Sequence, residues 1–312
     1  MKPFRFGISI WHVGSRAELA DRARKIEALG YDTLSFPDHL TDRIAPLPAL
    51  VTAANATTRL RVGTNVLNND LRHPVLVARE AAAVDLLTDG RLQLGLGAGS
   101  IRSEYDEVGL RFEIGRIRVE RLAEAVAVIK GLLSGETVTF SGTHYQIAGH
   151  TIAPLPAQKP HPPILIGGNG RRLLTLAARE ADIVGFSGIT FRNGGAAPPD
   201  VSAWRAAAVG ERVRLVREAA GEDRFARLEL NALVQRVIVT EDRYAAAEEL
   251  VRRWPELSAG EILETPYLLV GTVDQMVEDL KARRQRWGIS YYAIHEPYLD
   301  AFAPVAARLA GK

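Results

Sequence analysis

The 312-residue sequence contains no cysteine. Disulfide scaffolds, thiol catalysis and cysteine-ligated metal or iron–sulfur sites are therefore excluded. No apolar run reaches the length that a membrane span needs, and the first residues lack the apolar core of a secretory signal. The net charge is only +2, which is too small to indicate nucleic acid or an acidic membrane as a partner. We therefore expect a cytoplasmic globular protein with neither kind of partner.

Several catalytic motifs are also missing. The first expected strand continues through Ile8-Ser9-Ile10 to Gly14 without the G-x-G-x-x-G turn of a dinucleotide-binding unit. No cluster of His, Asp and Glu has metal-ligand spacing, so no metal site is predicted. A Gly-x-Ser-x-Gly nucleophile motif with triad partners is absent as well. The apolar content of 47% and charged content of 24% are ordinary for a globular enzyme.

Residues 60–99 form the clearest pattern that is present. An apolar, β-branched run at 60–67 predicts a buried strand, and Asn68-Asn69-Asp70 is typical of a turn. Pro74 suits the first turn of the helix that the apolar spacing predicts next. A second buried strand is expected at 92–99. Because a β–α–β unit in one sheet is parallel, both strands should end at the same edge, where ligands bind in such folds.

The rest of the chain repeats this alternation. Strands are expected at 4–10, 33–37, 60–67, 92–99, 163–167, 183–187, 228–239 and 290–294, and helices at 16–29, 47–56, 75–87, 115–133, 171–180, 203–219, 245–253 and 273–287, with a last helix from about 302. A small hairpin at 138–147 precedes a connector with five prolines at 153–163. Eight strands indicate a (β/α)₈ TIM barrel. We interpret 1–312 as a single domain with an insertion at about 134–161; a doubly wound sheet is the alternative.

Glycine and small residues follow two of the expected strands. Gly167-Gly168-Asn169-Gly170 joins a strand to a helix start, where free N–H groups and the helix dipole favour a phosphate; a plain tight turn is the alternative. Gly97-Ala98-Gly99 follows the central unit, where close packing of strand against helix is the simpler interpretation.

Several motifs together resemble one family. They are Phe36-Pro37-Asp38-His39, Arg72-His73-Pro74, the segment 85–99, and Pro156-x-Gln158-x-Pro160-x-Pro162-Pro163 leading into 164–168. Their order and spacing resemble the bacterial luciferase-like family of flavin- and deazaflavin-dependent oxidoreductases. Asp38-His39 after the second strand is similar to the branch that uses the deazaflavin coenzyme F420.

The resemblance implies a set of site residues. It implies a bulge behind the cofactor ring at Asn65-Val66, which in the family often contains a non-prolyl cis peptide, and a cofactor phosphate at 167–170. The implied cofactor-binding residues are Asp38, His39, Asn65, Val66, Asn68, Gly97, Ala98, Gly99, Gly167, Gly168, Asn169 and Gly170. Asn68 would bond a polar edge of the ring; a simple turn at 68–70 is the alternative.

His39 is the predicted catalytic residue. An imidazole exchanges protons near neutral pH, and this one follows a buried strand at the functional edge. Asp38 would orient His39 or bond the cofactor. One feature departs from the family's sugar-phosphate dehydrogenases, which carry a carboxylate where this chain has Ser100. Sugar-phosphate oxidation is therefore not expected unless Glu104 substitutes.

Three functions are compatible with these residues. The favoured hypothesis is an F420-dependent oxidoreductase that transfers hydride between the deazaflavin ring and a small organic substrate. The alternatives are an FMN-dependent monooxygenase, which uses reduced flavin and dioxygen, and a non-catalytic flavin-binding barrel. Trp11 and Phe186, with Phe191 and Tyr267, are the candidates for an apolar substrate wall. A homodimer is expected.

Overall fold

A computed structural model describes residues 1–41, 43–196 and 199–312. Eight parallel strands form a closed barrel, in the order β3-β2-β1-β13-β10-β9-β8-β5, and pairing of β3 with β5 closes the ring. The barrel strands are β1 (Arg5–Ser9), β2 (Thr33–Phe36), β3 (Arg61–Thr64), β5 (Leu92–Gly97), β8 (Ile164–Gly168), β9 (Ile183–Phe186), β10 (Glu229–Val234) and β13 (Ile289–His295). The predicted (β/α)₈ barrel is confirmed, and the doubly wound alternative is wrong.

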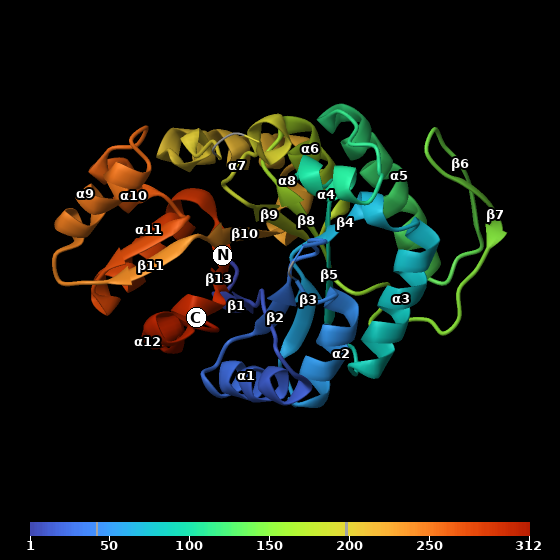
Figure 1. The fold of residues 1–312 in the computed structure, drawn as a ribbon, viewed down its shortest axis with the longest axis horizontal. Coiled ribbons are helices and arrows are strands. Elements are labelled where there is room, and N and C mark those ends of the chain that lie inside the picture. The colour runs from blue at the N-terminus through green and yellow to red at the C-terminus, as the bar shows by residue number, and fades with distance from the viewer. Residues whose placement is uncertain (42, 197–198) are drawn as a thin grey trace.

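Helices surround the barrel (Figure 1). They are α1 (Arg16–Ala28), α2 (Pro46–Asn55), α3 (Pro74–Leu87), α4 (Arg102–Glu107), α5 (Gly115–Leu133), α6 (Arg171–Glu180), α7 (Ala206–Ala220), α8 (Glu222–Arg227), α9 (Arg243–Arg253), α10 (Ala259–Glu264), α11 (Val273–Trp287) and α12 (Leu299–Leu309). Short 3₁₀ turns are η1 (Asn69–Leu71), η2 (Arg192–Gly195), η3 (Ser202–Trp204) and η4 (Glu296–Tyr298). No helix of the described residues is long and apolar enough to cross a membrane.

Helix boundaries follow their capping residues. The Ser15 side chain accepts the Glu18 N–H at the start of α1, and Thr272 forms a reciprocal capping box with Gln275 at the start of α11. Gly288 ends α11 in the left-handed conformation that glycine adopts at low cost. These ends agree with the predicted boundaries because capping is decided by local sequence.

The seventh predicted strand is wrong in one respect. The run 228–239 is two strands, β10 and β11 (Arg236–Val239). The backbone N–H of Gln235 donates to the carbonyl oxygen of Tyr267, with an N–O distance of 2.7 Å. The chain therefore leaves the barrel at Gln235. β11 then pairs in parallel with β12 (Leu268–Gly271), a strand that the sequence reading missed. With α9, α10 and α11 this pair forms a small α/β unit at one side of the barrel (Figure 1).

The hairpin lies outside the barrel, on the side away from that unit (Figure 1). It consists of β6 (Val138–Ser141) and β7 (Gln146–His150), which pair only with each other. The Glu124 carboxylate of α5 accepts the backbone N–H groups of 143–145 in the hairpin turn. Burial opposes ionisation of Glu124, but these hydrogen bonds outweigh it and lower its pKa. The hairpin is thus held on α5 by one ionised side chain.

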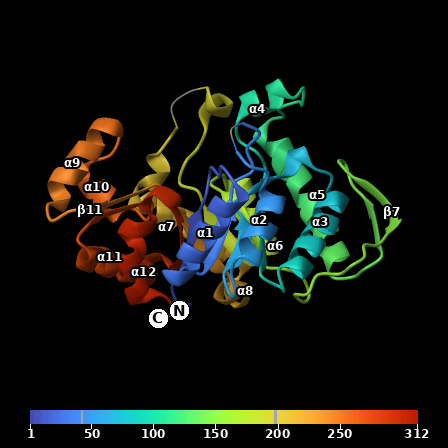
Figure 2. The same ribbon diagram turned by 60° about the horizontal axis from the view of Figure 1, so that its bottom comes forward.

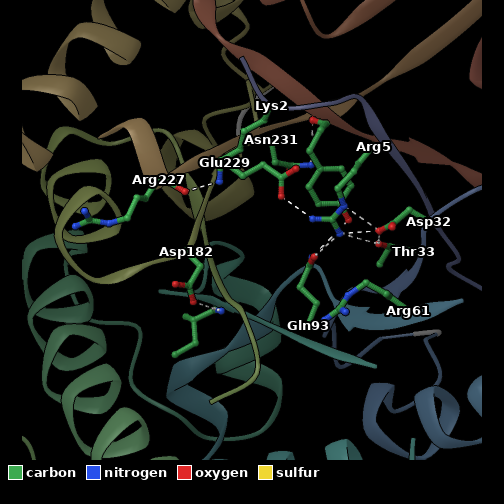
Figure 3. Close-up of polar contacts among 12 residues, drawn as sticks. Lys2, Arg5, Asp32, Thr33, Arg61, Gln93, Asp182, Arg227, Glu229 and Asn231 are labelled. Carbon is green, nitrogen blue, oxygen red and sulfur yellow. Dashed lines mark hydrogen bonds and ion pairs between the residues drawn. The ribbon is translucent and has the colours of Figure 1, made fainter. Parts of the chain in front are cut away.

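The amino-terminal end of the barrel is closed by a polar network (Figure 3). The Arg5 guanidinium donates to Asp32 at 2.7 Å, to Glu229 at 2.6 Å and to Gln93 at 3.2 Å. It also lies 4.6 Å from the ring centroid of Tyr291. Both chain termini lie at this end, where Phe4 bridges Ala310, while α4 lies at the opposite end (Figure 2). A site that needs an opening must therefore use the carboxyl ends of the strands.

Candidate functional site

A cavity of about 1150 Å³ opens at the carboxyl ends of the strands. Its wall contains all the residues that were predicted to bind the cofactor, and Phe186 and Phe191 as well. They are Asp38, His39, Asn65, Val66, Asn68, Gly97, Ala98, Gly99, Gly167, Gly168, Asn169 and Gly170. Residues from five barrel strands and their loops thus meet at one place, as ligand sites of this architecture require. The roles of these residues remain predictions.

Two candidates for the substrate wall lie elsewhere. Trp11 is 40% exposed and does not line the cavity; its ring lies edge-on to His295 at 4.6 Å and beneath Arg43 at 4.4 Å. Tyr267 is fully buried, with its ring 6.0 Å from that of Trp204. Neither residue is among the described residues that line this cavity, and their place in a substrate wall stays a prediction.

His39 is paired with Glu104. His39 Nδ1 lies 2.7 Å from Oε1 of Glu104, whose side chain is only 4% exposed. A carboxylate only accepts hydrogen bonds, so Nδ1 carries a hydrogen, and in the neutral imidazole Nε2 then has the lone pair. Among the described residues Nε2 has no hydrogen-bond partner, and the His39 side chain is 32% exposed at the cavity. An imidazole fixed in this tautomer can accept a proton from a molecule in the cavity.

Asp38 does not orient His39 in this structure. One of its oxygens accepts the backbone N–H of Asn68 at 3.0 Å, and the Arg72 guanidinium binds both oxygens. The side chain is 4% exposed. Asp38 therefore ties the end of β2 to β4 (Leu67–Asn68), and the carboxylate that holds His39 comes from α4 instead.

Val66 lines the cavity and packs against buried residues of the barrel interior, so it forms part of the cavity floor. The Asn65–Val66 peptide is cis, as the resemblance implied. A Cβ added at Gly97 would lie 2.5 Å from Val66, and one at Gly167 would lie 3.2 Å from it. Glycine is therefore required at Gly97 because Val66 fills the space, which favours the packing interpretation of that residue. The same holds at Gly99, where a Cβ would lie 1.9 Å from the hydroxyl of Tyr105.

Gly170, at the end of the loop 167–170, differs in having open space beside it. A Cβ at Gly170 would meet no atom of the described residues within 4 Å. Gly170 is the N-cap residue of α6, so the free N–H groups of the first helical turn lie next to this space. The Asn169 side chain is already used, since it donates to Ile189 at 2.9 Å and accepts from Gly188 at 3.1 Å. An anion here would be bound by backbone N–H groups.

Arginines surround this part of the cavity, and the sequence reading did not single them out. Arg171 and Arg172 are exposed in the first turn of α6 and form no ion pair within the described part of the chain. Arg116 and Arg118 on α5 and Arg212 on α7 also line the cavity. Two cations at the positive end of a helix repel its dipole, and a bound anion would relieve that cost.

The α4 helix was also missed, since the segment after Gly99 was interpreted as a loop. It carries Glu104 and, next to it, Tyr105, whose hydroxyl contacts Asn68 at 3.0 Å. Burial, and next the neighbouring Asp70 carboxylate, raise the pKa of Tyr105 to about 12, so the phenol stays protonated. The helix has only six residues, four of them charged, and no capping side chain marks its start. No pattern of the sequence indicated it.

The first curated relatives that match are named as F420 enzymes. The F420-dependent glucose-6-phosphate dehydrogenase of Microbacterium testaceum is 36% identical over 190 residues, which cover 58% of this chain and 55% of that protein. The chain thus spans about half the length of the first curated relatives that it matches.

Solved structures share the fold over almost the entire chain. The coenzyme F420-dependent tetrahydromethanopterin reductase from Methanopyrus kandleri superposes with a TM-score of 0.76 at 17% identity, covering 99% of this chain and 98% of that one. A long-chain alkane monooxygenase superposes with a TM-score of 0.74 at 15% identity, covering 99% and 91%. The family model described as luciferase-like monooxygenase matches residues 4–291. The chain therefore belongs to the luciferase-like monooxygenase family.

Proposed function

We propose that the protein is an F420-dependent oxidoreductase that transfers hydride between the deazaflavin ring and a small organic substrate. The observation that carries this proposal is the His39–Glu104 pair at 2.7 Å in the wall of a cavity that also contains the loop 167–170. The pair supplies a proton-transfer group, and the loop supplies an anion site. Hydride-transfer enzymes with a phosphorylated cofactor need both in one cavity.

The residues present fit such a cofactor. The deazaflavin has a broad planar ring, an alkyl chain with hydroxyls and an anionic tail that begins with a phosphate. Val66 lines the floor of the cavity together with Gly97 and Gly167, which carry no side chain that would obstruct the ring, and Asn68 offers a polar group at its edge. The open space at Gly170 and the cations Arg171 and Arg172 suit the phosphate. We assign the ring to the floor and the phosphate to the start of α6.

His39 would handle the proton of the reaction. When bound, the deazaflavin supplies the hydride chemistry. Oxidation of an alcohol also releases the hydroxyl proton, and Nε2 of His39 has the lone pair to accept it. The resulting imidazolium is stabilised by the Glu104 carboxylate on Nδ1, as in other carboxylate–histidine pairs. In the reverse direction the same imidazolium returns the proton.

A flavin monooxygenase is the second candidate. The family model is described as monooxygenase, and the likeness to the alkane monooxygenase covers 99% of this chain. The two cofactors differ chemically at one ring atom. The flavin has nitrogen at position five and its reduced form reacts with dioxygen, whereas the deazaflavin has carbon there and forms no stable oxygen adduct. The names of the curated relatives favour the deazaflavin.

Cofactor binding tests the proposal directly. Purified protein is titrated separately with F420 and with FMN, in oxidised and reduced form, and the bound fraction is followed by absorbance and fluorescence. We expect binding of F420 at least about tenfold tighter than binding of FMN, equivalent to about 1.4 kcal/mol. Tighter binding of reduced FMN with oxygen consumption would replace the proposal by the monooxygenase. Binding without turnover of any alcohol, aldehyde or sugar phosphate would favour the non-catalytic barrel.

A further inference from the structure

The amide of Asn68 has a fixed orientation. Its Oδ1 accepts the backbone N–H of Asp70 at 3.1 Å and lies 3.0 Å from the hydroxyl of Tyr105. A backbone N–H is only a donor, so turning the amide around would place its NH₂ group against the Asp70 N–H. The oxygen therefore faces Asp70, and the nitrogen Nδ2 must point the other way.

The nitrogen of this amide is open to the cavity. Asn68 lines the cavity although the whole residue is only 6% exposed. Among the described residues no acceptor binds Nδ2, yet Nδ2 is not one of the polar atoms sealed off from solvent. A donor that is almost buried and has no protein partner is costly, and such a donor in a cavity indicates a ligand atom that accepts its hydrogen.

The short helix α4 connects this amide with His39. Glu104 binds His39 and the next residue, Tyr105, contacts Asn68. Tyr105 is fully buried, and its hydroxyl also lies 3.1 Å from the Asp70 carboxylate. Two adjacent residues of α4 thus hold the two polar side chains that end β2 and β4. A displacement of α4 would disturb the proton-transfer group and the cavity donor together.

We propose that Tyr105 is a positioning residue that holds the Asn68 amide in this orientation, so that the contact expected between Asn68 and the polar edge of the ring is a hydrogen bond donated from Nδ2 to a ring acceptor. The proposal rests on the cofactor ring of the proposed function and goes beyond it in assigning the direction of the hydrogen bond. A site built in this way selects a ring that presents a carbonyl or an unprotonated nitrogen at this position and disfavours one that presents an N–H.

The test is the pH dependence of ring binding by Asn68→Asp. This change keeps the shape and the acceptor for the Asp70 N–H, but replaces the donor at the cavity by a second oxygen. At pH 7.5 the carboxylate faces a ring acceptor, and we expect the dissociation constant for oxidised F420 to rise about tenfold or more relative to wild type. Near pH 4.5 a protonated carboxyl can donate, and the ratio of variant to wild-type dissociation constants should fall several-fold.

Tyr105→Phe and Tyr145→Phe form a matched pair. Both remove one phenol hydroxyl from the neighbourhood of η1, but the Tyr145 hydroxyl lies 3.4 Å from Asn69 and does not contact Asn68. Tyr105→Phe should weaken F420 binding about threefold, as expected for one indirect hydrogen bond, and Tyr145→Phe should leave the dissociation constant unchanged. Thermal unfolding of each variant without cofactor separates loss of stability from loss of positioning.

The outcomes distinguish this inference from the proposed function. If wild type prefers FMN, the proposed function fails and the same ratios are measured with FMN, whose ring also has acceptors at its polar edge. Two results would overturn the assignment of Nδ2 as a donor. In the first, Asn68→Asp and wild type have nearly the same dissociation constant at pH 7.5. In the second, the dissociation constant of the variant is raised by the same factor at every pH. Equal weakening by Tyr105→Phe and Tyr145→Phe would overturn the role of Tyr105. Failure of wild type to bind either ring would overturn both proposals.

Discussion

The two ends of the barrel differ in how far the hydrogen bonds of their polar side chains are made within the chain. At the amino-terminal end, the Arg5 guanidinium is bound by Asp32, Glu229 and Gln93 and covered by Tyr291 (Figure 3). At the carboxyl end, two side chains of the cavity wall, His39 and Asn68, each keep one polar atom without a hydrogen-bond partner among the described residues. His39 is bound through Nδ1 only, and Asn68 is bound through Oδ1 only.

This difference separates stability from function in one fold. A polar group whose hydrogen bonds are all made within the chain contributes to the folded state, and removing its partner exposes the full cost of burial. A polar group with one free atom adds little to folding and keeps that atom for a ligand. The closed end should therefore control the free energy of unfolding, and the open end should control binding and turnover.

The largest effect is expected on the free energy of unfolding, when the arginine at the amino-terminal end of the barrel is replaced. Arg5→Met would leave Asp32 and Glu229 without their cation, and the Glu229 side chain is only 8% exposed. Breaking such a pair from one side costs about 3 kcal/mol of unfolding free energy, somewhat less than for fully buried pairs. For a chain of this length the melting temperature should fall by roughly 5–10 °C. Calorimetry or thermal circular dichroism measures it.

The matched control is Arg214→Met. Arg214 pairs with Glu218 on the exposed face of α7, with side chains 67% and 57% exposed. Exposed pairs of this kind contribute at most about 0.5 kcal/mol, so the melting temperature should hardly change. Equal melting temperatures for the two variants would mean that the Arg5 network does not stabilise the barrel.

The next effect concerns turnover at the open end. His39→Ala should lower the turnover number by roughly a hundredfold or more, the range typical of a lost acid–base group. It should weaken cofactor binding only modestly. Because the change leaves the Glu104 carboxyl, which is only 4% exposed, without its partner, the free energy of unfolding should fall by about 1–3 kcal/mol. The assay follows F420 absorbance with a reactive alcohol or with an artificial acceptor.

His150→Ala on the exposed strand β7 is the control, and it should retain wild-type turnover. Wild-type turnover by His39→Ala would remove this residue from the mechanism and leave it a residue that packs against the ring. If His39→Ala instead failed to fold, His39 would be needed for stability, and the assignment of stability to the amino-terminal end of the barrel would be contradicted.

A smaller effect is expected at the start of α6. Gly170→Asp places a carboxylate in the open space where the cofactor phosphate is proposed to bind. Like charges should raise the dissociation constant for F420 about tenfold at low salt, and less at high salt. The backbone of Gly170 has φ −72°, which any residue adopts, and Asp is a good N-cap, so stability should be kept.

Gly170→Asn is the neutral control of the same shape and should bind F420 nearly as wild type does. Gly168 is a poorer position for this test, because a Cβ there would lie 2.2 Å from Leu173 and disturb the fold. Equal affinities of the Asp and Asn variants would place the phosphate elsewhere.

The smallest effect is a pH dependence of stability from His295. Burial, and next the positive charge of Arg43, lower the pKa of His295 to about 4. The ordinary value in an unfolded chain is about 6.5. The folded state thus favours neutral His295, so its contribution is complete above pH 6.5 and is lost as the pH falls toward 4. His295→Gln should show a smaller fall in melting temperature between pH 7.5 and pH 4.5. An identical fall in both proteins would contradict this assignment.

The sequence predicted the elements that local chemistry decides. The start and end of α5 at Gly115 and Leu133 and of α11 at Val273 and Trp287 agree with prediction, because spacing and caps lie within the helix itself. The split of 228–239 was not predictable in the same way. Most of its residues are apolar on both sides of Gln235, and the hydrogen bond of Gln235 with the carbonyl of Tyr267 joins residues that are far apart in the sequence.

The location of the candidate site residues was predicted from the sequence, but their hydrogen-bond partners were not. Strand ends meet at one edge of a parallel barrel, so His39, Asn68 and the loop 167–170 could be placed together from strand order alone. The partner of His39 lies 65 residues away on a short helix that no pattern marked. The contact of Trp11 with Arg43 could not be predicted for the same reason, since it depends on how two loops pack.

The most direct measurement compares F420 binding by Arg5→Met and Gly170→Asp under one condition. Each protein is titrated at 15 °C, where both are folded, and each melting temperature is recorded in the same buffer. The account predicts that Arg5→Met melts several degrees lower but binds F420 as wild type does, whereas Gly170→Asp keeps its melting temperature and binds about tenfold more weakly. The opposite pattern, with binding lost in Arg5→Met and kept in Gly170→Asp, would contradict the assignment of stability to one end of the barrel and function to the other.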